Sequence, residues 1–420
     1  MNIPLCLLLL VSSVFASSKY FIFISDIHQD PFYLTHSMPG KEGDWCRKRL
    51  PLPEHVAATF GRPGCDIPYP LAKSCFDAAK RFAPDPEFIL VGGDLPSHDL
   101  PSADVSMNLV RNVTKEITTR FPHVPIISTI GNNDVYPGYT APDLFELSKV
   151  WGPAMKNEKA AEEFSRQGFY RFDLNNSKLT FLVLSTNMYS PSYKDSFSFF
   201  SSANYKSNVD PFGQFQWLEK QLKRTYSEGR SVLIAGHIAP GPNAYDDGLQ
   251  WQDFFSERYL QLVQTFGSHI AAQFFGHIHA TDYRLISPNT GPIFIGGAVS
   301  SVYMNNPNFK VVFYNEEEIV DIDTYYLDLF LANKEKKTVW KKESSLKSLY
   351  NLDNLSSKSL DSLTKLVIKD RSAWNRYIDH RSSLIFPRRF AYGCAMRFLI
   401  DQDYRQCLID NSNEYYKSFF

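Results

Sequence analysis

Five segments of this chain each end an apolar run with aspartate, asparagine or histidine. Carboxylate and amide oxygens together with imidazole nitrogens suit divalent metals, and one carboxylate can bridge two of them. We therefore interpret these residues as a candidate site for two divalent metals. The runs and the motifs that follow them are YFIFIS before Asp26-Ile27-His28, EFILVG before Gly93-Asp94, VPIISTI before Gly131-Asn132-Asn133-Asp134, SVLIA before Gly236-His237, and AAQFF before Gly276-His277-Ile278-His279.

The apolar runs have the length and the β-branched and aromatic content of buried strands. In an α/β sheet, ligands bind at the edge where the carboxyl ends of the strands lie, so the five motifs are expected to meet there. Side chains at i and i+2 of a strand point to the same side. Asp26 and His28 can therefore face one metal, and His277 and His279 can each serve a metal. Each motif taken singly also fits a polar turn at a strand end, but the five motifs in this order specifically indicate a metal site.

Some residues in the motifs, and one histidine near them, suggest more particular roles. Asp94 is the natural bridging carboxylate, because its two oxygens can each take one metal, and Gly93 before it allows close approach of the backbone. Asn132 could ligate through its amide oxygen, with Asn133 and Asp134 holding it in place. His98 lies four residues after Asp94 and is a candidate general acid; a solvent-exposed loop histidine is the alternative.

Length and charge limit the classes of protein. A chain of 420 residues predicts a large catalytic domain with an appendage. Lysine and arginine number 44 against 45 acidic residues, which argues against a polycationic surface for nucleic acid or an anionic membrane. We expect a monomer that binds no nucleic-acid duplex and makes at most peripheral membrane contact.

Residues 1–17 have a short apolar core and a small-residue cleavage pattern, so we interpret them as a signal peptide. The mature chain is then expected to be secreted, or to enter a lysosome-like lumen where disulfides form. Cys46 with Cys65 and Cys394 with Cys407 are the expected pairs, and Cys75 is expected to be buried and free. Three sequons are candidate glycosylation sites, at Asn112, Asn175 and Asn354.

Helical periodicity predicts helices over 70–82, 104–120 and within 141–170, and a further strand over 178–185. Residues 31–70 lack periodicity and predict a long loop, stapled beside the site by a disulfide. After about residue 325 the pattern becomes helical and Lys-rich, with the charged faces interpreted as solvated. The expected division is thus a signal peptide over residues 1–17, a catalytic domain over 18–325 and a helical subdomain over 326–420.

The full set of motifs resembles the calcineurin-like metallophosphoesterases, and within them the acid sphingomyelinase-like phosphodiesterases. Asp94-Leu95-Pro96-Ser97-His98-Asp99 is similar to that family's Gly-Asp-x-Pro-x-His-Asp segment, and Asn305-Asn306-Pro307-Asn308-Phe309-Lys310 to its Asn-Asn-Pro-x-Phe-Arg segment, with Lys for Arg. The resemblance implies an α/β fold with two mixed β-sheets flanked by helices, a small helical C-terminal subdomain, and a dinuclear site most expected to hold Zn²⁺.

Carried over by residue, the resemblance implies two overlapping ligand sets. One metal would take Asp26, His28, Asp94 and His279, and the other Asp94, Asn132, His237 and His277. The implied reaction is hydrolysis of phosphodiester or phosphoanhydride bonds by a metal-bridging hydroxide, with His98 protonating the leaving group. The family usually has histidine at position 133, where it contacts or protonates the phosphate; Asn133 occupies that catalytic position here.

The resemblance implies a small-molecule or lipid head-group phosphodiester as the substrate, and its identity stays open between sphingomyelin-type head groups and nucleotides. No saposin-like segment precedes the motifs, which favours soluble diesters. Gly-Asn-Asn-Asp is also similar to endopolyphosphatases, a related branch that often lacks the histidine present here as His279. A third hypothesis is a catalytically weak protein that keeps the metal site and binds lipid or glycan through aromatic loops, because 15% of the residues are aromatic.

Overall fold

The apolar runs form the strands of two mixed sheets, as predicted. The structure is a computed structural model that describes residues 19–34, 46–47, 58–175, 177–194, 210–315, 317–381 and 389–417. The proposed signal peptide lies outside these residues. The first sheet has the order β12-β11-β10-β1-β2-β3, with β1 (Lys19–Ile24), β2 (Ile89–Val91), β3 (Ile126–Ser128), β10 (Asn308–Tyr314), β11 (Ile319–Leu327) and β12 (Trp340–Ser345).

The second sheet has the order β4-β5-β6-β7-β9-β8. Its strands are β4 (Tyr170–Asp173), β5 (Leu179–Val183), β6 (Ser231–Ala235), β7 (Ile270–Phe275), β8 (Asp282–Arg284) and β9 (Ile293–Ile295). In each sheet the central strands that carry the motifs run parallel, β1-β2-β3 in the first and β6-β7 in the second. Their carboxyl ends therefore lie at one edge of the sandwich.

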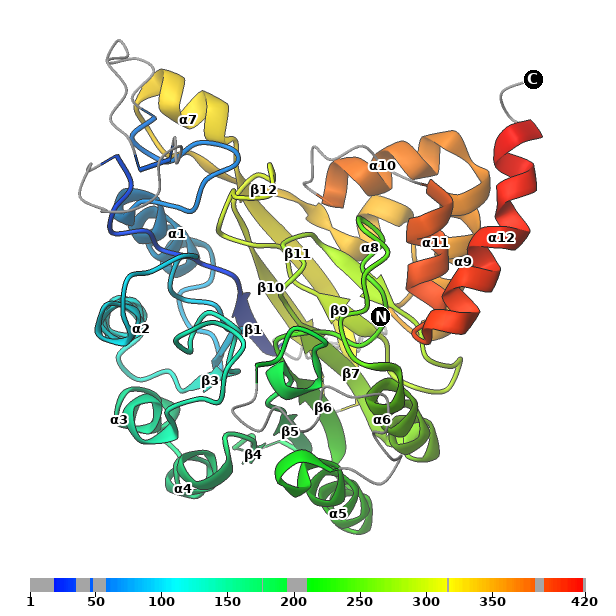
Figure 1. Cartoon of the computed structure of the whole chain (residues 1–420), viewed down its shortest axis with the longest axis horizontal. Coiled ribbons are helices and arrows are strands. Elements are labelled where there is room, and N and C mark those ends of the chain that lie inside the picture. The colour runs from blue at the N-terminus through cyan, green and yellow to red at the C-terminus, as the bar shows by residue number, and fades with distance from the viewer. Residues whose placement is uncertain are drawn as a thin grey trace, which may run out of the picture.

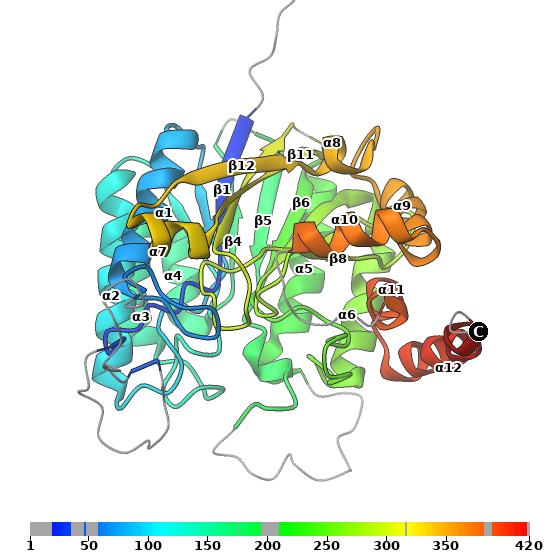
Figure 2. The same ribbon diagram turned by 90° about the horizontal axis from the view of Figure 1, so that it is seen from above.

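Helices cover the outer faces of the two sheets. Figures 1 and 2 show α1–α4 on one side of the sandwich, and α5 and α6 on the other, with α9–α12 gathered beside them. The bounds are α1 (Tyr69–Phe82), α2 (Ala103–Arg120), α3 (Leu144–Met155), α4 (Glu158–Gln167), α5 (Gln214–Ser227), α6 (Asp253–Thr265), α7 (Leu329–Glu335), α8 (Leu346–Tyr350), α9 (Ser357–Lys369), α10 (Arg371–Arg381), α11 (Arg389–Arg397) and α12 (Asp401–Lys417). None of these helices is long and apolar enough to span a bilayer.

Aromatic side chains fill the space between the sheets. Phe21 of β1 stacks on Phe88 at 4.5 Å between ring centroids and meets Phe274 of β7 edge-on at 5.4 Å. Phe88 in turn meets Phe181 of β5 edge-on at 5.2 Å. These rings are buried, and burying aromatic surface is a large contribution to stability. They fix the two sheets against each other and so fix the edge at which the motifs meet.

The C-terminal region is less uniformly helical than its sequence suggests. It carries α7–α12, but Trp340–Ser345 forms β12 and pairs antiparallel with β11 at the edge of the first sheet. The expected boundary at 325/326 falls inside β11. The charged sequence WKKESS has little intrinsic strand preference, so pairing with β11 decides its conformation.

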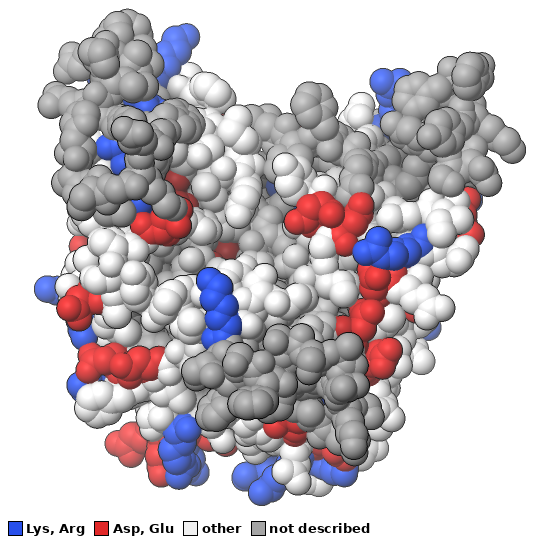
Figure 3. Space-filling view, in the orientation of Figure 1, with Lys and Arg blue, Asp and Glu red and all other residues white. Residues whose placement is uncertain are grey.

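Both predicted disulfides are present, and Cys75 is buried and free as expected. The Cys46–Cys65 bond closes part of the long loop after β1, and Cys394–Cys407 joins α11 to α12. Asn112, Asn175 and Asn354 are all exposed, which is compatible with glycosylation. On the face seen in Figure 3, the described acidic and basic side chains lie in small scattered groups, consistent with a net charge of −1.

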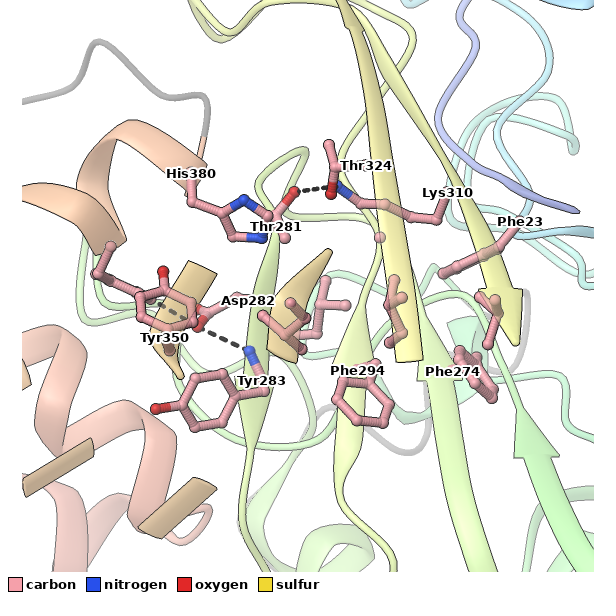
Figure 4. Close-up of a pocket in the computed structure, with 16 residues that line it drawn as sticks. Phe23, Phe274, Thr281, Asp282, Tyr283, Phe294, Lys310, Thr324, Tyr350 and His380 are labelled. Carbon is pink, nitrogen blue, oxygen red and sulfur yellow. Dashed lines mark hydrogen bonds between the residues drawn. The ribbon is translucent and has the colours of Figure 1, made fainter. Parts of the chain in front are cut away.

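Lys310, in the Asn-Asn-Pro segment, is buried between the sheet and the C-terminal helices. Its ammonium donates hydrogen bonds to the hydroxyls of Thr281 (2.6 Å) and Thr324 (3.0 Å). Figure 4 shows it beside a largely apolar cavity that phenylalanine rings and His380 also line. Burial lowers the pKa of Lys310 to about 7, because the charged form loses its hydration.

This buried lysine gives a prediction about stability and pH. The unfolded chain binds the proton near pH 10.5 and the folded chain near 7, so the cost of burial is complete below pH 7 and is relieved as the pH rises towards 10.5. Lys310→Met should therefore unfold less readily than the wild type at pH 5.5, by a few kcal/mol, and the gain should shrink by pH 9. Urea unfolding at both pH values measures this. The exposed control Lys341→Met should show no such pH-dependent gain, and an equal gain at both pH values would contradict the prediction.

Candidate active site

The structure brings the seven predicted ligands together at the shared edge of the sandwich. Ligand atoms of Asp26, His28 and His279 lie within 4.8 Å of one another, and so do those of Asp94, His237 and His277. Asp94 Oδ2 is 3.4 Å from His28 Nε2 and 3.4 Å from His237 Nε2, so it joins the two groups. Asn132 Oδ1 lies 3.1 Å from His237 Nε2. The grouping is the one that the resemblance implied.

Glycines before the ligands permit this convergence. A Cβ on Gly131 would stand 2.1 Å from Asp94 Oδ1, and one on Gly93 would stand 2.7 Å from the Gly131 backbone nitrogen. No side chain fits at these separations, so the loops after β2 and β3 can touch only through glycine.

Backbone strain is concentrated in the candidate ligands themselves. A left-handed backbone typically costs a residue other than glycine of order 1–3 kcal/mol and persists where the surroundings enforce it, often at functional sites. Five of the seven candidates adopt it: Asp26 (φ 51°), His28 (φ 45°), Asp94 (φ 56°), His277 (φ 73°) and His279 (φ 54°). The loops therefore hold these side chains in place at the expense of local stability.

The hydrogen bonds of two histidines test whether the site fits metals. His28 Nδ1 lies 3.0 Å from the Pro96 carbonyl, and His237 Nδ1 lies 2.6 Å from the Gly92 carbonyl. Each Nδ1 must donate to its carbonyl, so Nε2 is the nitrogen left to bind a metal. His28 Nε2 lies 3.0 Å from His279 Nε2, and His237 Nε2 lies 3.1 Å from Asn132 Oδ1. Imidazole nitrogens that converge with carboxylate and amide oxygens are a set of donor atoms that fits divalent metals.

The protonation states agree with this fit. Burial lowers the pKa of His28 to about 4 and that of His277 to about 3, so both imidazoles are neutral near pH 7 and keep a lone pair for a metal. Burial also acts on His237, but the Asp94 and Asp26 carboxylates outweigh it and raise its pKa to about 10. The negative field at His237 thus attracts a positive charge, whether a proton or a metal.

Asn133 takes a supporting place rather than facing the cleft. Its side-chain Nδ2 donates to Asp94 Oδ2 at 2.8 Å, and its backbone nitrogen donates to Asp94 Oδ1 at 2.7 Å. Asp134 accepts from three backbone nitrogens, those of Asp94, Leu95 and Gly131, and braces the loop. Asn133 therefore contacts Asp94, the carboxylate that joins the two groups, and not Asn132, which it was expected to hold.

Removing that support should weaken metal binding. Asn133→Ala deletes the Nδ2 donor but keeps the backbone donor, so we expect metal affinity to fall about 10- to 100-fold, as for other groups that orient ligands. Competition with a chelator measures the affinity. Asn108→Ala, at an exposed position of α2, is the control. Unchanged affinity in Asn133→Ala would show that the backbone nitrogen alone positions Asp94.

His98 lies next to the metal ligands with its own carboxylate partner. Its ring stacks on His28 with centroids 4.2 Å apart and planes inclined by 10°, and its side chain is 33% exposed. Nδ1 is 2.9 Å from Asp66 Oδ2, and the His98 backbone nitrogen donates to the same oxygen at 2.8 Å. Burial opposes protonation, but Asp66 outweighs it and raises the pKa of His98 to about 9. At neutral pH the ring thus carries a proton.

Asp66 was not among the predicted site residues. It follows Cys65 of the first disulfide, and its second oxygen accepts from the Ser300 hydroxyl at 3.0 Å. Arg47, also in this loop, donates to the backbone carbonyls of His98 and Asp99 at 2.8 and 3.0 Å. The stapled loop therefore positions the segment that carries His98, and its cysteines were the one sequence signal that pointed to it.

Two sheets end in strained loops that gather aspartate, asparagine and histidine into two adjacent groups, as expected of a metal-dependent phosphoesterase. The family model for calcineurin-like phosphoesterases matches residues 19–281, and the model for the C-terminal region of acid sphingomyelin phosphodiesterases matches residues 287–414. The chain belongs to the calcineurin-like phosphoesterases, in the branch of the acid sphingomyelinase-like phosphodiesterases. It is a phosphodiester hydrolase of a family that uses divalent metals.

Curated relatives match over nearly the whole chain. Sphingomyelinase phosphodiesterase D of Dictyostelium discoideum is 29% identical over 415 residues, covering 90% of this chain and 92% of the relative. Human acid sphingomyelinase-like phosphodiesterase 3b is 29% identical over 420 residues, covering 92% and 89%. Human cyclic GMP-AMP phosphodiesterase SMPDL3A is 26% identical over 415 residues, covering 92% and 89%.

Proposed function

We propose that this chain is a dinuclear phosphodiesterase of the secretory route that cleaves phosphodiester or phosphoanhydride bonds of lipid head groups or nucleotides. The observation that carries the proposal is that His28 Nε2 and His237 Nε2 each lie 3.4 Å from Asp94 Oδ2. Asp26, His28, Asp94 and His279 would hold one metal, and Asp94, Asn132, His237 and His277 the other. Imidazole and carboxylate ligands make zinc the first candidate.

With metals bound, the chemistry available is Lewis acidity toward phosphoryl oxygens and a water whose pKa is lowered from about 15.7 towards neutrality. The chain's own residues supply the rest. Asn133 and the backbone of the β3 loop orient the Asp94 carboxylate. His98 holds a proton beside the ligands, and Asp66 keeps its Nδ1 engaged. As the bond from phosphorus to the leaving oxygen breaks, His98 gives that oxygen a proton.

The relatives' names indicate which substrates to test first. The names are those of sphingomyelinase and cyclic dinucleotide phosphodiesterases, so lipid head groups and nucleotides are the first substrates to test. The two disulfides support a secreted or lumenal location, because such bonds persist in oxidising compartments.

One experiment tests the proposal as a whole. The purified protein is assayed for bound metals and for turnover of bis(4-nitrophenyl) phosphate, sphingomyelin, ATP and polyphosphate, at pH 5 and pH 7.5. We expect close to two divalent metals per chain and turnover of phosphodiesters. Turnover of polyphosphate alone would favour an endopolyphosphatase. Metal without any turnover would favour a binding protein, and absence of metal together with activity would overturn the dinuclear assignment.

A further inference from the structure

A cleft of 390 Å³ lies beside the metal ligands. His277 and His279 line one part of it, and Arg381 at the end of α10 and Tyr392 of α11 line another. The cleft therefore joins the catalytic edge to the C-terminal region, and a substrate whose phosphorus sits at the histidines can extend towards α10. Whatever charge Arg381 presents there bears directly on which substrates fit.

Arg381 belongs to a buried cluster with an excess of positive charge. Its Nη1 donates to Asp282 Oδ2 at 2.5 Å and to the Tyr377 hydroxyl at 2.9 Å. Arg284 donates to the same Asp282 oxygen at 2.8 Å. Two guanidinium groups thus share one carboxylate, and arginine stays charged in proteins. The three side chains are buried, so water compensates the extra charge poorly.

One edge of the Arg381 guanidinium is unused. Among the residues that the structure describes, its Nε is buried without a hydrogen-bond partner, and its Nη2 makes no hydrogen bond. The guanidinium carbon lies 4.2 Å from the centroid of the Tyr392 ring, which fixes its plane. Because Nε is enclosed, Nη2 is the nitrogen left to donate to a phosphate or carboxylate oxygen in the cleft.

Among the described residues that line the cleft, Arg381 is the only arginine or lysine. The cleft does have a carboxylate, Asp246, but it is exposed, and exposed charges are strongly screened. The buried arginine therefore dominates the charge at its end of the cleft.

We propose that Arg381 is a specificity-determining residue that binds a second anionic group of the substrate, such as a further phosphate, while the reacting phosphorus lies at the histidines. The proposal rests on the proposed function, and it favours nucleotides that carry several phosphates over zwitterionic head groups. A cationic head group held by Asp246 and the tyrosines of the cleft is the opposite outcome, and the substrates below separate the two.

The test compares three substrates in three variants of the full-length, metal-loaded protein. The substrates are ATP, bis(4-nitrophenyl) phosphate and 4-nitrophenyl phosphorylcholine. In Arg381→Met we expect the ratio of kcat/KM for ATP to that for bis(4-nitrophenyl) phosphate to fall about 10- to 100-fold, the range for a lost charge-assisted pair. Arg381→Lys should lie between, because it keeps the charge but not the planar guanidinium.

Arg284→Met is the matched control. Arg284 shares Asp282 and also has an unpartnered Nε, but it does not line the cleft. We expect its substrate ratio to fall clearly less than that of Arg381→Met, because Arg284→Met removes the extra charge of the cluster but keeps the guanidinium that lines the cleft. Arg381→Met leaves Asp282 paired with Arg284, so the variant is expected to fold. An equal change of ratio in both methionine variants would show that Arg381 itself does not select the substrate and would overturn the proposal.

A binding measurement makes the proposal independent of turnover. Calorimetric titration with pyrophosphate and with phosphate should show tighter binding of pyrophosphate to the wild type, and a preference reduced about tenfold or more in Arg381→Met. An unchanged preference, or a loss confined to the phosphorylcholine ester, would overturn the role of Arg381. A wild type that turns over none of the three substrates would instead overturn the proposed function, and the pyrophosphate preference would still decide on Arg381.

Discussion

Asp94→Asn is expected to lower kcat on bis(4-nitrophenyl) phosphate by on the order of 10³-fold or more and to release bound metal. Asp94 Oδ2 lies 3.4 Å from both His28 Nε2 and His237 Nε2. Asparagine has nearly the same shape but only one acceptor oxygen and no charge. It can serve one group of ligands at most, so the pair of metal sites should lose its common member. Steady-state kinetics and elemental analysis of the purified variant measure the two effects.

The control for this substitution is Asp323→Asn. Asp323 is a buried aspartate of β11 that pairs with Lys342 at 2.6 Å and lies outside the ligand groups. Its variant should keep both metals and wild-type kcat, even if it is less stable. Asp94→Asn that retained two metals and more than a tenth of the activity would show that Asp94 does not join the sites.

The edge that carries the site could be predicted because its signals are local. Each motif directly follows an apolar run, and parallel strands place their carboxyl ends at a common edge. The meeting of two sheets has no such local signal. Asp94 follows β2 of the first sheet and His237 follows β6 of the second. The strand pattern predicted that the motifs would meet at a sheet edge, but only the resemblance implied that two sheets form that edge.

The residues that sequence reasoning missed are those placed by long-range packing. Asp66 lies 32 positions before His98, in a loop without periodicity. The Cys46–Cys65 disulfide and a hydrogen bond from the Ser300 hydroxyl hold it beside the His98 ring. Arg381 ends a charged helix, a pattern that usually indicates a solvated face. Its burial follows from the docking of α10 onto Asp282 of β8, which no local pattern encodes.

The role of Asn133 shows the limit of a family comparison. Position 133 usually carries a histidine that faces the phosphate, and the resemblance alone places Asn133 in that catalytic position. Its side chain instead donates to Asp94 at 2.8 Å. From the loop after β3, the Asn133 amide reaches the carboxylate in the loop after β2. His98 is then the described residue best placed to supply a proton.

His98→Gln should cost most on substrates whose leaving group needs a proton. A positioned general acid typically contributes 10²–10⁴-fold, so we expect a loss in this range of kcat/KM on alkyl phosphodiesters. The loss on 4-nitrophenyl esters should be at least tenfold smaller, because nitrophenolate leaves without protonation. Equal losses on the two kinds of ester would assign His98 a structural role, which its stacking on His28 at 4.2 Å makes a real alternative.

Asp66→Asn separates these two roles further, because it keeps the His98 ring in place. Asp66 raises the pKa of His98 to about 9, so the carboxylate keeps the ring protonated as the pH rises. The acid form is required for proton donation, and activity on alkyl esters should therefore fall as the pH passes this pKa. In Asp66→Asn the pKa drops towards the ordinary histidine value of about 6.5, and the alkaline limb should move to lower pH. A limb that stays in place would mean that another group supplies the proton.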